Sequence, residues 1–267
     1  MNTSARSITT TANPRTAHPA PMWRRVISQT RYEALTMLRN GEQLLLLVIL
    51  PVIALVALSR MDLLDSVLPA GASRLDYAVP GVLALSVISN AFSGQGIQTG
   101  FDRRYGVLRQ LATTPLGRSG LIAGKLGAIL LVLAAQTVLI GAVAWFMGWH
   151  PSASALLEAA PLLVLGAVAF TGLGLLAAGT MRAEATLAVV NLLWVLLAVV
   201  GGTLAPASAL PEWLAPLIGL LPSAALADGL RHVMVPDDPG ALLGPVVVLA
   251  AWAAIAWAAT ARWFRWS

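Results

Sequence analysis

Six apolar runs, separated by polar segments, dominate the hydropathy pattern of the chain. They cover residues 43–59, 77–100, 121–148, 155–180, 186–204 and 241–260. The shortest run still reaches the lower limit of about 17 residues that a helix needs to cross the hydrocarbon core of a bilayer. The pattern therefore predicts an all-α membrane protein with six transmembrane helices.

The segment before the first run, Trp23 to Asn40, shows a helical stripe instead. Apolar residues recur at spacings of three and four, while Arg24, Arg25 and Arg39 fall on the opposite face. This predicts an amphipathic helix on the inner membrane surface, where basic residues meet anionic lipid. Residues 1–22 are polar and are expected to form a disordered cytoplasmic tail, which leaves 23–267 as the membrane domain.

The stretch between the fifth and sixth runs is apolar but short. Trp213 to Ala227 is broken by Pro216 and Pro222 and is too short to span. We predict a re-entrant helical hairpin in the outer leaflet, with Trp213 at the interface and Leu221 and Pro222 at its tip. Asp228 and Arg231 would then return to water. A loop lying flat on the outer surface is the alternative.

The composition indicates the class of protein, and the distribution of charge indicates its orientation in the membrane. The chain has 267 residues, of which 58% are hydrophobic and 11% charged, with a mean hydropathy of +0.78, whereas soluble domains carry about 25% charged residues. In a six-span topology, Arg60, Arg74 and Arg231 lie outside and the other basic residues lie inside. The positive-inside rule therefore places both termini in the cytoplasm.

The sequence lacks the motifs that several kinds of chemistry require. The chain has no P-loop, so ATP hydrolysis is not expected of it. It has no cysteine, and its three histidines lie far apart, so we expect no metal site. No charged residue lies deep inside a predicted span, which argues against an ion-coupled carrier. Two alternatives stay open: a non-transporting assembly subunit, and a lipid-modifying enzyme using the outer polar residues Glu212, Asp228, Arg231, His232, Asp237 and Asp238.

A few uncharged polar residues interrupt the predicted spans and are candidates for lining a substrate pathway. They are Asn90, Gln95, Gln98, Gln136 and Asn191. Hydrogen bonding between neighbouring helices is the other explanation for such residues.

The loop from Phe101 to Lys125 carries five of the seventeen basic residues. Its first half, Asp102 to Leu111, is predicted to form a short amphipathic helix that Pro115 and Gly117 terminate. Such a helix between two spans would suit the binding of another protein, although a plain basic loop held inside by its charge explains the same residues.

Residues Gly106 to Lys125 of this loop resemble a known family. Gly106-x-Leu108-x-x-Leu111, then Thr-Thr-Pro-Leu at 113–116 and Lys125 opening an apolar helix, is similar to the permease subunits of ABC-2-type exporters. The resemblance implies that the chain binds no cofactor and that two cytoplasmic ATPase subunits carry ATP and Mg. It also implies a second permease copy or a paralogue and a place in the bacterial plasma membrane. The placement of the basic residues follows the positive-inside rule and argues against nucleic acid as a partner.

The resemblance further implies which residues meet the ATPase and what is moved. Docking would involve the central loop and the N-terminal helix, through Asp102, Arg103, Arg104, Tyr105, Val107, Leu108, Arg109, Leu111, Arg31 and Glu33. The substrate would be hydrophobic or amphipathic: a drug or antibiotic first, a lipid or polysaccharide otherwise.

Overall fold

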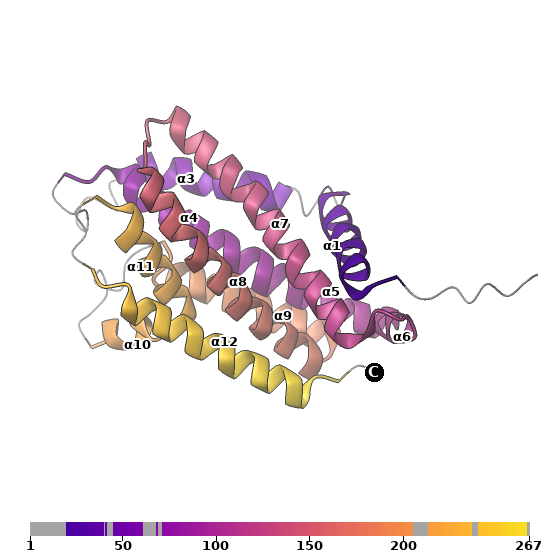
Figure 1. Cartoon of the computed structure of the whole chain (residues 1–267). Coiled ribbons are helices and arrows are strands. Elements are labelled where there is room, and N and C mark those ends of the chain that lie inside the picture. Colours follow the sequence, from indigo (N-terminus) through magenta and orange to yellow (C-terminus); the bar gives the residue numbers. More distant parts are fainter. Residues whose placement is uncertain are drawn as a thin grey trace, which may run out of the picture.

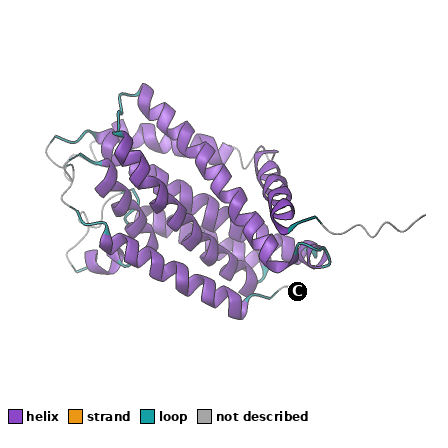
Figure 2. Cartoon of the chain, viewed as in Figure 1, coloured by secondary structure: helices purple, strands orange, loops and turns teal. Residues whose placement is uncertain are grey.

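A computed structural model describes residues 20–39, 41, 45–60, 68, 71–204, 213–236 and 240–265. Every regular element in these ranges is a helix (Figure 2), which confirms the all-α prediction. The predicted tail lies outside them apart from residues 20–22. The elements are α1 (Met22–Arg39), the π-helix η1 (Leu45–Ile49), α3 (Leu50–Arg60), α4 (Arg74–Val87), the π-helix η3 (Ile88–Gly94), α5 (Gln95–Arg104), α6 (Val107–Ala112), α7 (Gly117–Phe146), α8 (Ala153–Thr180), α9 (Ala183–Val199), α10 (Ala215–Gly219), α11 (Pro222–Met234) and α12 (Leu243–Trp263).

Four helical stretches within the described residues are long and apolar enough to cross a membrane. They are α4–η3–α5 as one continuous stretch of 31 residues, α7, α8 and α12. The first and fifth predicted runs also form apolar helices, but these are shorter, at Leu47–Arg60 and Ala183–Val199. A multi-pass membrane protein is therefore supported, and the full count of six spans stays a prediction.

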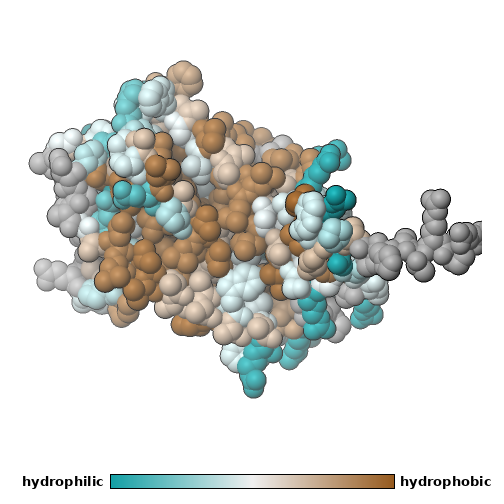
Figure 3. Space-filling view, in the orientation of Figure 1, coloured by the Kyte–Doolittle hydropathy of each residue, from teal (hydrophilic) through white to brown (hydrophobic). Residues whose placement is uncertain are grey.

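The long helices lie side by side, and the short elements gather at their two ends (Figure 1). We call one the α6 end, where α1, α6 and the C-terminal residues lie, and the other the α11 end, where α10 and α11 lie. Figure 3 shows hydrophobic residues across the middle and the most hydrophilic residues toward the ends. Large apolar side chains such as Val138 and Leu157 are more than 70% exposed. A band of this kind is what a bilayer would cover.

The continuous α4–η3–α5 stretch forms the centre of the bundle. All residues of α4 from Tyr77 to Val87 are buried. Helix α8 approaches η3 closely at Gly174, where an added Cβ would lie 2.8 Å from the Phe92 carbonyl oxygen. Glycine at this position therefore permits the helix contact, as expected for small residues in a membrane bundle.

The segment predicted to form the outer hairpin contains two helices, α10 and α11. Trp213 is exposed, whereas Pro222 and most of α11 are buried. Residues 205–212, which precede Trp213, lie outside the described residues, and insertion of the pair into the outer leaflet stays a prediction.

One part of that prediction is wrong: Arg231 does not return to water and is only 2% exposed. Its guanidinium donates to the carbonyl oxygens of Gly202 at 2.8 Å and Thr203 at 2.6 Å. It also pairs with Asp228 at 2.9 Å and lies 4.5 Å from the centre of the Tyr77 ring. These partners compensate the cost of burying the charge and fasten α11 to α4 and to the end of α9.

Candidate functional site at the α6 end

The elbow, which we define as Arg103 to Leu116, connects two of the long helices. Sequence analysis predicted one helix from Asp102 to Leu111, but the chain turns at Gly106, whose φ of 75° ends α5 and starts α6. Glycine reaches this left-handed conformation without steric cost. The hydroxyls of Thr113 and Thr114 donate to the carbonyls of Gln110 and Leu111 at 2.7 and 2.6 Å, which closes α6.

The apolar face of α6 packs against the protein itself. Leu108 is 1% exposed and forms a buried cluster with Leu116 and Leu121. Val26 of α1 and Leu111 pack against this cluster. Leu108 therefore anchors the elbow internally, and its side chain is not on an outer surface.

The outer surface of the elbow is polar and basic. Arg104, Tyr105 and Arg109 are exposed, with Tyr105 at 69%. Arg104 forms an ion pair with Glu184 at the start of α9. Of the other residues predicted to dock, Arg31 is exposed, Asp102, Arg103, Val107 and Leu111 are partly buried, and Glu33 is buried.

The Glu33 side chain points into the protein, where it belongs to a buried ionic cluster. The Lys125 ammonium group lies 3.1 Å from a carboxylate oxygen of Glu33 and 3.1 Å from one of Asp102. Glu33 also accepts hydrogen bonds from Gln29 at 2.9 Å and from Gln98 at 3.0 Å. The cluster joins α1, α5 and α7 in the interior, and its pairing offsets the large cost of burying charges.

Sequence analysis placed Lys125 where the loop meets the apolar run 121–148, and the structure places it inside α7, with 1% of its surface exposed. Lys125 is the only lysine of the chain and stands in an apolar helical pattern. Since lysine is almost never fully buried unless paired, that position was the available signal for a buried carboxylate partner.

Helix α1 lies tightly against α7 next to this cluster. The Thr30 hydroxyl donates to the Gly124 carbonyl at 3.3 Å. An added Cβ at Gly124 would lie 2.5 Å from a side-chain carbon of Gln29, and one at Gly127 would lie 2.6 Å from the Thr30 hydroxyl. The two glycines therefore let α1 approach α7.

Of the five candidate pathway residues, Asn90, Gln95 and Gln136 are buried, Gln98 is partly buried and Asn191 is exposed. Most of them have partners on neighbouring helices. Gln136 on α7 accepts from the Asn90 amide at 2.5 Å and donates to the Leu47 carbonyl at 2.5 Å. It thereby links η3 to η1, two π-helical segments of the kind often found at functional sites.

The remaining three differ from one another. Gln98 bonds to Glu33, and Asn191 accepts from the Ser93 hydroxyl at 3.4 Å. Gln95 is fully buried, and both polar atoms of its side chain lack a hydrogen-bond partner among the described residues. Four of the five candidate residues thus make hydrogen bonds between helices. A role in the substrate pathway stays a prediction for all five.

Only three of the six outer polar residues named for the enzyme alternative, Asp228, Arg231 and His232, belong to the described part of the chain. Asp228 and Arg231 pair with each other, and Glu212, Asp237 and Asp238 lie outside the described residues. Within the described ranges, no group of three or more metal-ligating side chains is present.

Comparison with known protein families gives a match over most of the chain. The family model described as ABC-2 type transporter matches residues 21–235, which include α1, the elbow and α11. A sequence comparison with curated proteins returns no match.

Proposed function

The chain belongs to the ABC-2 type transporter family, and we propose that it is the permease of an ATP-driven exporter that carries a hydrophobic or amphipathic substrate out of the cell. The observation that carries this proposal is the family match together with an exposed, basic elbow between two membrane-crossing helices. The energy would come from ATPase subunits that bind at the α6 end, which would face the cytoplasm.

The docking surface would be the outer side of the elbow. Arg104, Tyr105 and Arg109 are exposed there, and Arg31 is exposed on the neighbouring α1. The packing of Leu108 inside the elbow supports this assignment because it holds the exposed face in a fixed orientation. Arginine and tyrosine are also enriched in protein interfaces.

The buried cluster would pass a displacement of the elbow to α1 and α7. Asp102 lies immediately before the elbow, and Lys125 connects it to Glu33 on α1. Since both acids share one ammonium group, α5, α1 and α7 would move as a unit when ATP closure displaces the docking surface. This is a rigid-body rearrangement between two states.

The substrate class follows from the membrane interior. The predicted spans offer apolar side chains with a few uncharged amides, such as Asn90, Gln95 and Gln136, which suits an amphipathic drug-like molecule better than an ion. A pathway would form with a second copy of the chain or with a paralogue. Substrate identity, outward direction and pairing are all parts of the proposal.

Inside-out vesicles test the proposal. They would contain the chain and an ABC ATPase subunit, and ATP-dependent uptake of a fluorescent amphiphilic dye would be measured. Arg104→Glu combined with Arg109→Glu should abolish uptake at unchanged expression, because the basic docking surface becomes acidic. Arg60→Glu is the matched control, since Arg60 is an exposed arginine at the end of α3 away from the elbow. Equal uptake by the parent chain, the double variant and Arg60→Glu would refute docking at the elbow. Uptake that does not depend on ATP would refute the assignment as an ATP-driven exporter.

A further inference from the structure

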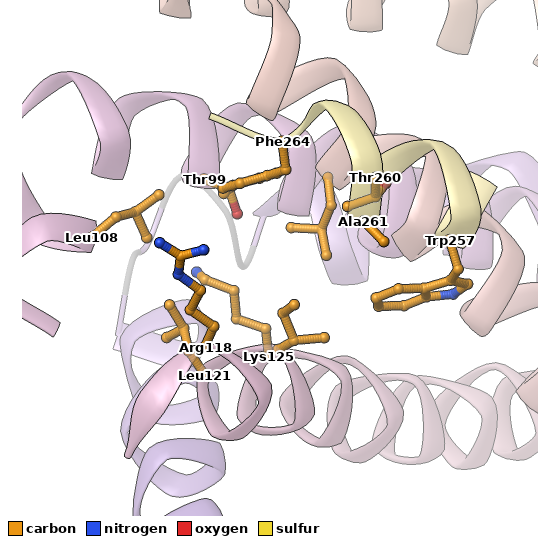
Figure 4. A pocket seen from close by; sticks show the side chains of 11 residues that line it. Thr99, Leu108, Arg118, Leu121, Lys125, Trp257, Thr260, Ala261 and Phe264 are labelled. Atoms are coloured by element: carbon orange, nitrogen blue, oxygen red, sulfur yellow. The ribbon is translucent and has the colours of Figure 1, made fainter. Parts of the chain in front are cut away.

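A cavity of ≈ 220 Å³ lies near the elbow, between α5, α6, α7, α8 and α12. Apolar side chains form most of its wall, including Leu121, Ile122, Leu175 and Trp257 (Figure 4). Its volume is below the range of about 300–1,000 Å³ typical of pockets for drug-sized ligands. It exceeds the roughly 150 Å³ of an apolar cavity that holds benzene. A narrow apolar group, such as the first half of one acyl chain, fits these dimensions.

One end of the cavity is cationic. Arg118 and Lys125 extend from α7 side by side at this end, while Trp257 lies at the other (Figure 4). Lys125 is paired with two carboxylates, those of Glu33 and Asp102, so it offers no net positive charge. The positive charge at the rim comes from Arg118, which is exposed. A guanidinium is always charged, and its five N–H donors form a planar fork that matches the geometry of a phosphate group.

Two further arginines strengthen this positive field beside the Phe264 wall of the cavity. Arg265 follows Phe264 in the chain and repels the guanidinium of Arg103. One terminal nitrogen of Arg103 is buried without a hydrogen-bond partner among the described residues, while the other donates to the Met181 carbonyl. A group of cations with an unsatisfied donor is suited to an anion.

A buried hydroxyl inside the cavity provides an independent sign of an occupant. Thr99 is 1% exposed, its hydroxyl oxygen has no hydrogen-bond partner in the described structure, and it points toward the cavity (Figure 4). The other threonine of the wall, Thr260, is satisfied by donation to the Gly172 carbonyl at 3.0 Å. Buried polar groups are nearly always paired, so Thr99 has donor capacity for a ligand oxygen.

We propose that this cavity binds an anionic phospholipid of the inner leaflet, with the phosphate at Arg118, an ester oxygen near Thr99 and one acyl chain toward Trp257. The amphipathic character follows from the arrangement: cations at the rim, a hydroxyl inside and apolar walls beyond. Basic pockets between transmembrane helices on the cytoplasmic side bind anionic headgroups in this manner. The lipid would fill the space between α7 and α12 and support the packing of the elbow through Leu108.

Native mass spectrometry of the purified full chain tests the site without any ATPase, so its outcome is independent of the exporter proposal. The chain is equilibrated with equal amounts of phosphatidylglycerol and phosphatidylcholine, and the retained lipid is counted. Phosphatidylglycerol should be retained preferentially. Arg118→Gln should weaken its retention about fivefold, the effect expected for one basic contact near a membrane surface. Ala261→Phe, which enlarges an exposed residue that lines the cavity, should exclude the acyl chain and abolish retention.

The matched control is Arg109→Gln, which removes an exposed charge from the elbow outside the cavity and should leave retention unchanged. Glycerol 1-phosphate, added as a headgroup without chains, should not displace the lipid. The proposal is overturned if the two lipids are retained equally, if Arg109→Gln and Arg118→Gln have equal effects, or if Ala261→Phe binds like the parent. Displacement by glycerol 1-phosphate would also overturn it, because the site would then bind only a phosphate.

Discussion

The ammonium group of Lys125 lies 3.1 Å from the carboxylate of Glu33, and the two side chains are 1% and 4% exposed. This pair ties the amphipathic helix α1 to α7, which is long and apolar enough to cross a membrane. Asp102, on the last turns of α5, shares the same ammonium group. The three helices that surround the elbow are therefore joined by a single buried charge.

Lys125→Met should lower the free energy of unfolding by about 3–5 kcal/mol, because it leaves buried carboxylates without their cation. Unfolding of the purified chain in detergent micelles measures the change. Adding Glu33→Gln and Asp102→Asn to Lys125→Met should recover much of the loss, since no uncompensated charge then remains. Parent-like stability of Lys125→Met alone would contradict the role given to the cluster.

Leu108→Asp and Tyr105→Asp should behave differently, although both introduce a carboxylate into the elbow. Leu108 is buried at 1% exposure and Tyr105 is 69% exposed. Leu108→Asp should therefore destabilise the fold by several kcal/mol through a buried unpaired charge, whereas Tyr105→Asp should unfold like the parent and lose ATP-driven uptake. Equal unfolding curves for the two variants would contradict the inward orientation of Leu108.

Gln136→Leu should cost about 1–3 kcal/mol, the usual penalty for leaving buried polar groups unsatisfied. The change removes the hydrogen bonds to Asn90 and to the Leu47 carbonyl. Val138→Leu on the same helix, at a position 72% exposed, is the control and should be neutral. If both variants unfold alike, the link between the two π-helical segments contributes nothing measurable.

Hydropathy located the main helices from the sequence because a bilayer demands a long apolar run in each spanning helix. The runs at 121–148 and 155–180 correspond to α7 and α8. The pairing of Lys125 with Glu33 was not accessible in this way, because the periodicity of one helix does not identify its neighbour. The sequence of the elbow predicted a helix, but not the change of direction between α5 and α6, which depends on the turn at Gly106.

The burial of Arg231 was missed for a related reason. Asp228 and Arg231 indicated a return to water, but the partners of Arg231 include two backbone carbonyls. Carbonyls belong to every residue type and leave no mark in a sequence. The same applies to Gly174, whose importance comes from the Phe92 carbonyl on another helix.

Arg231→Met should loosen α11 from the bundle, since it removes the bonds to Gly202 and Thr203. The chain lacks cysteine, so Ser223→Cys introduces a single reporter at a position that is fully buried. A water-soluble thiol reagent should leave this cysteine unlabelled in the otherwise unchanged chain and label it when Arg231→Met is added. Equal protection in both chains would mean that Arg231 does not hold α11 in place.

Docking of an ATPase at the elbow is the central claim, and site-directed crosslinking in native membranes measures it most directly. A single cysteine is placed at Tyr105 or, as the control, at Arg60, and a thiol-to-amine crosslinker is added. We predict a crosslink from Tyr105→Cys to a subunit that mass spectrometry identifies as an ABC ATPase by its P-loop, with a yield that changes when ATP is added. Arg60→Cys should give none. A crosslink to that ATPase from Arg60→Cys but not from Tyr105→Cys, or none from either, would contradict the account.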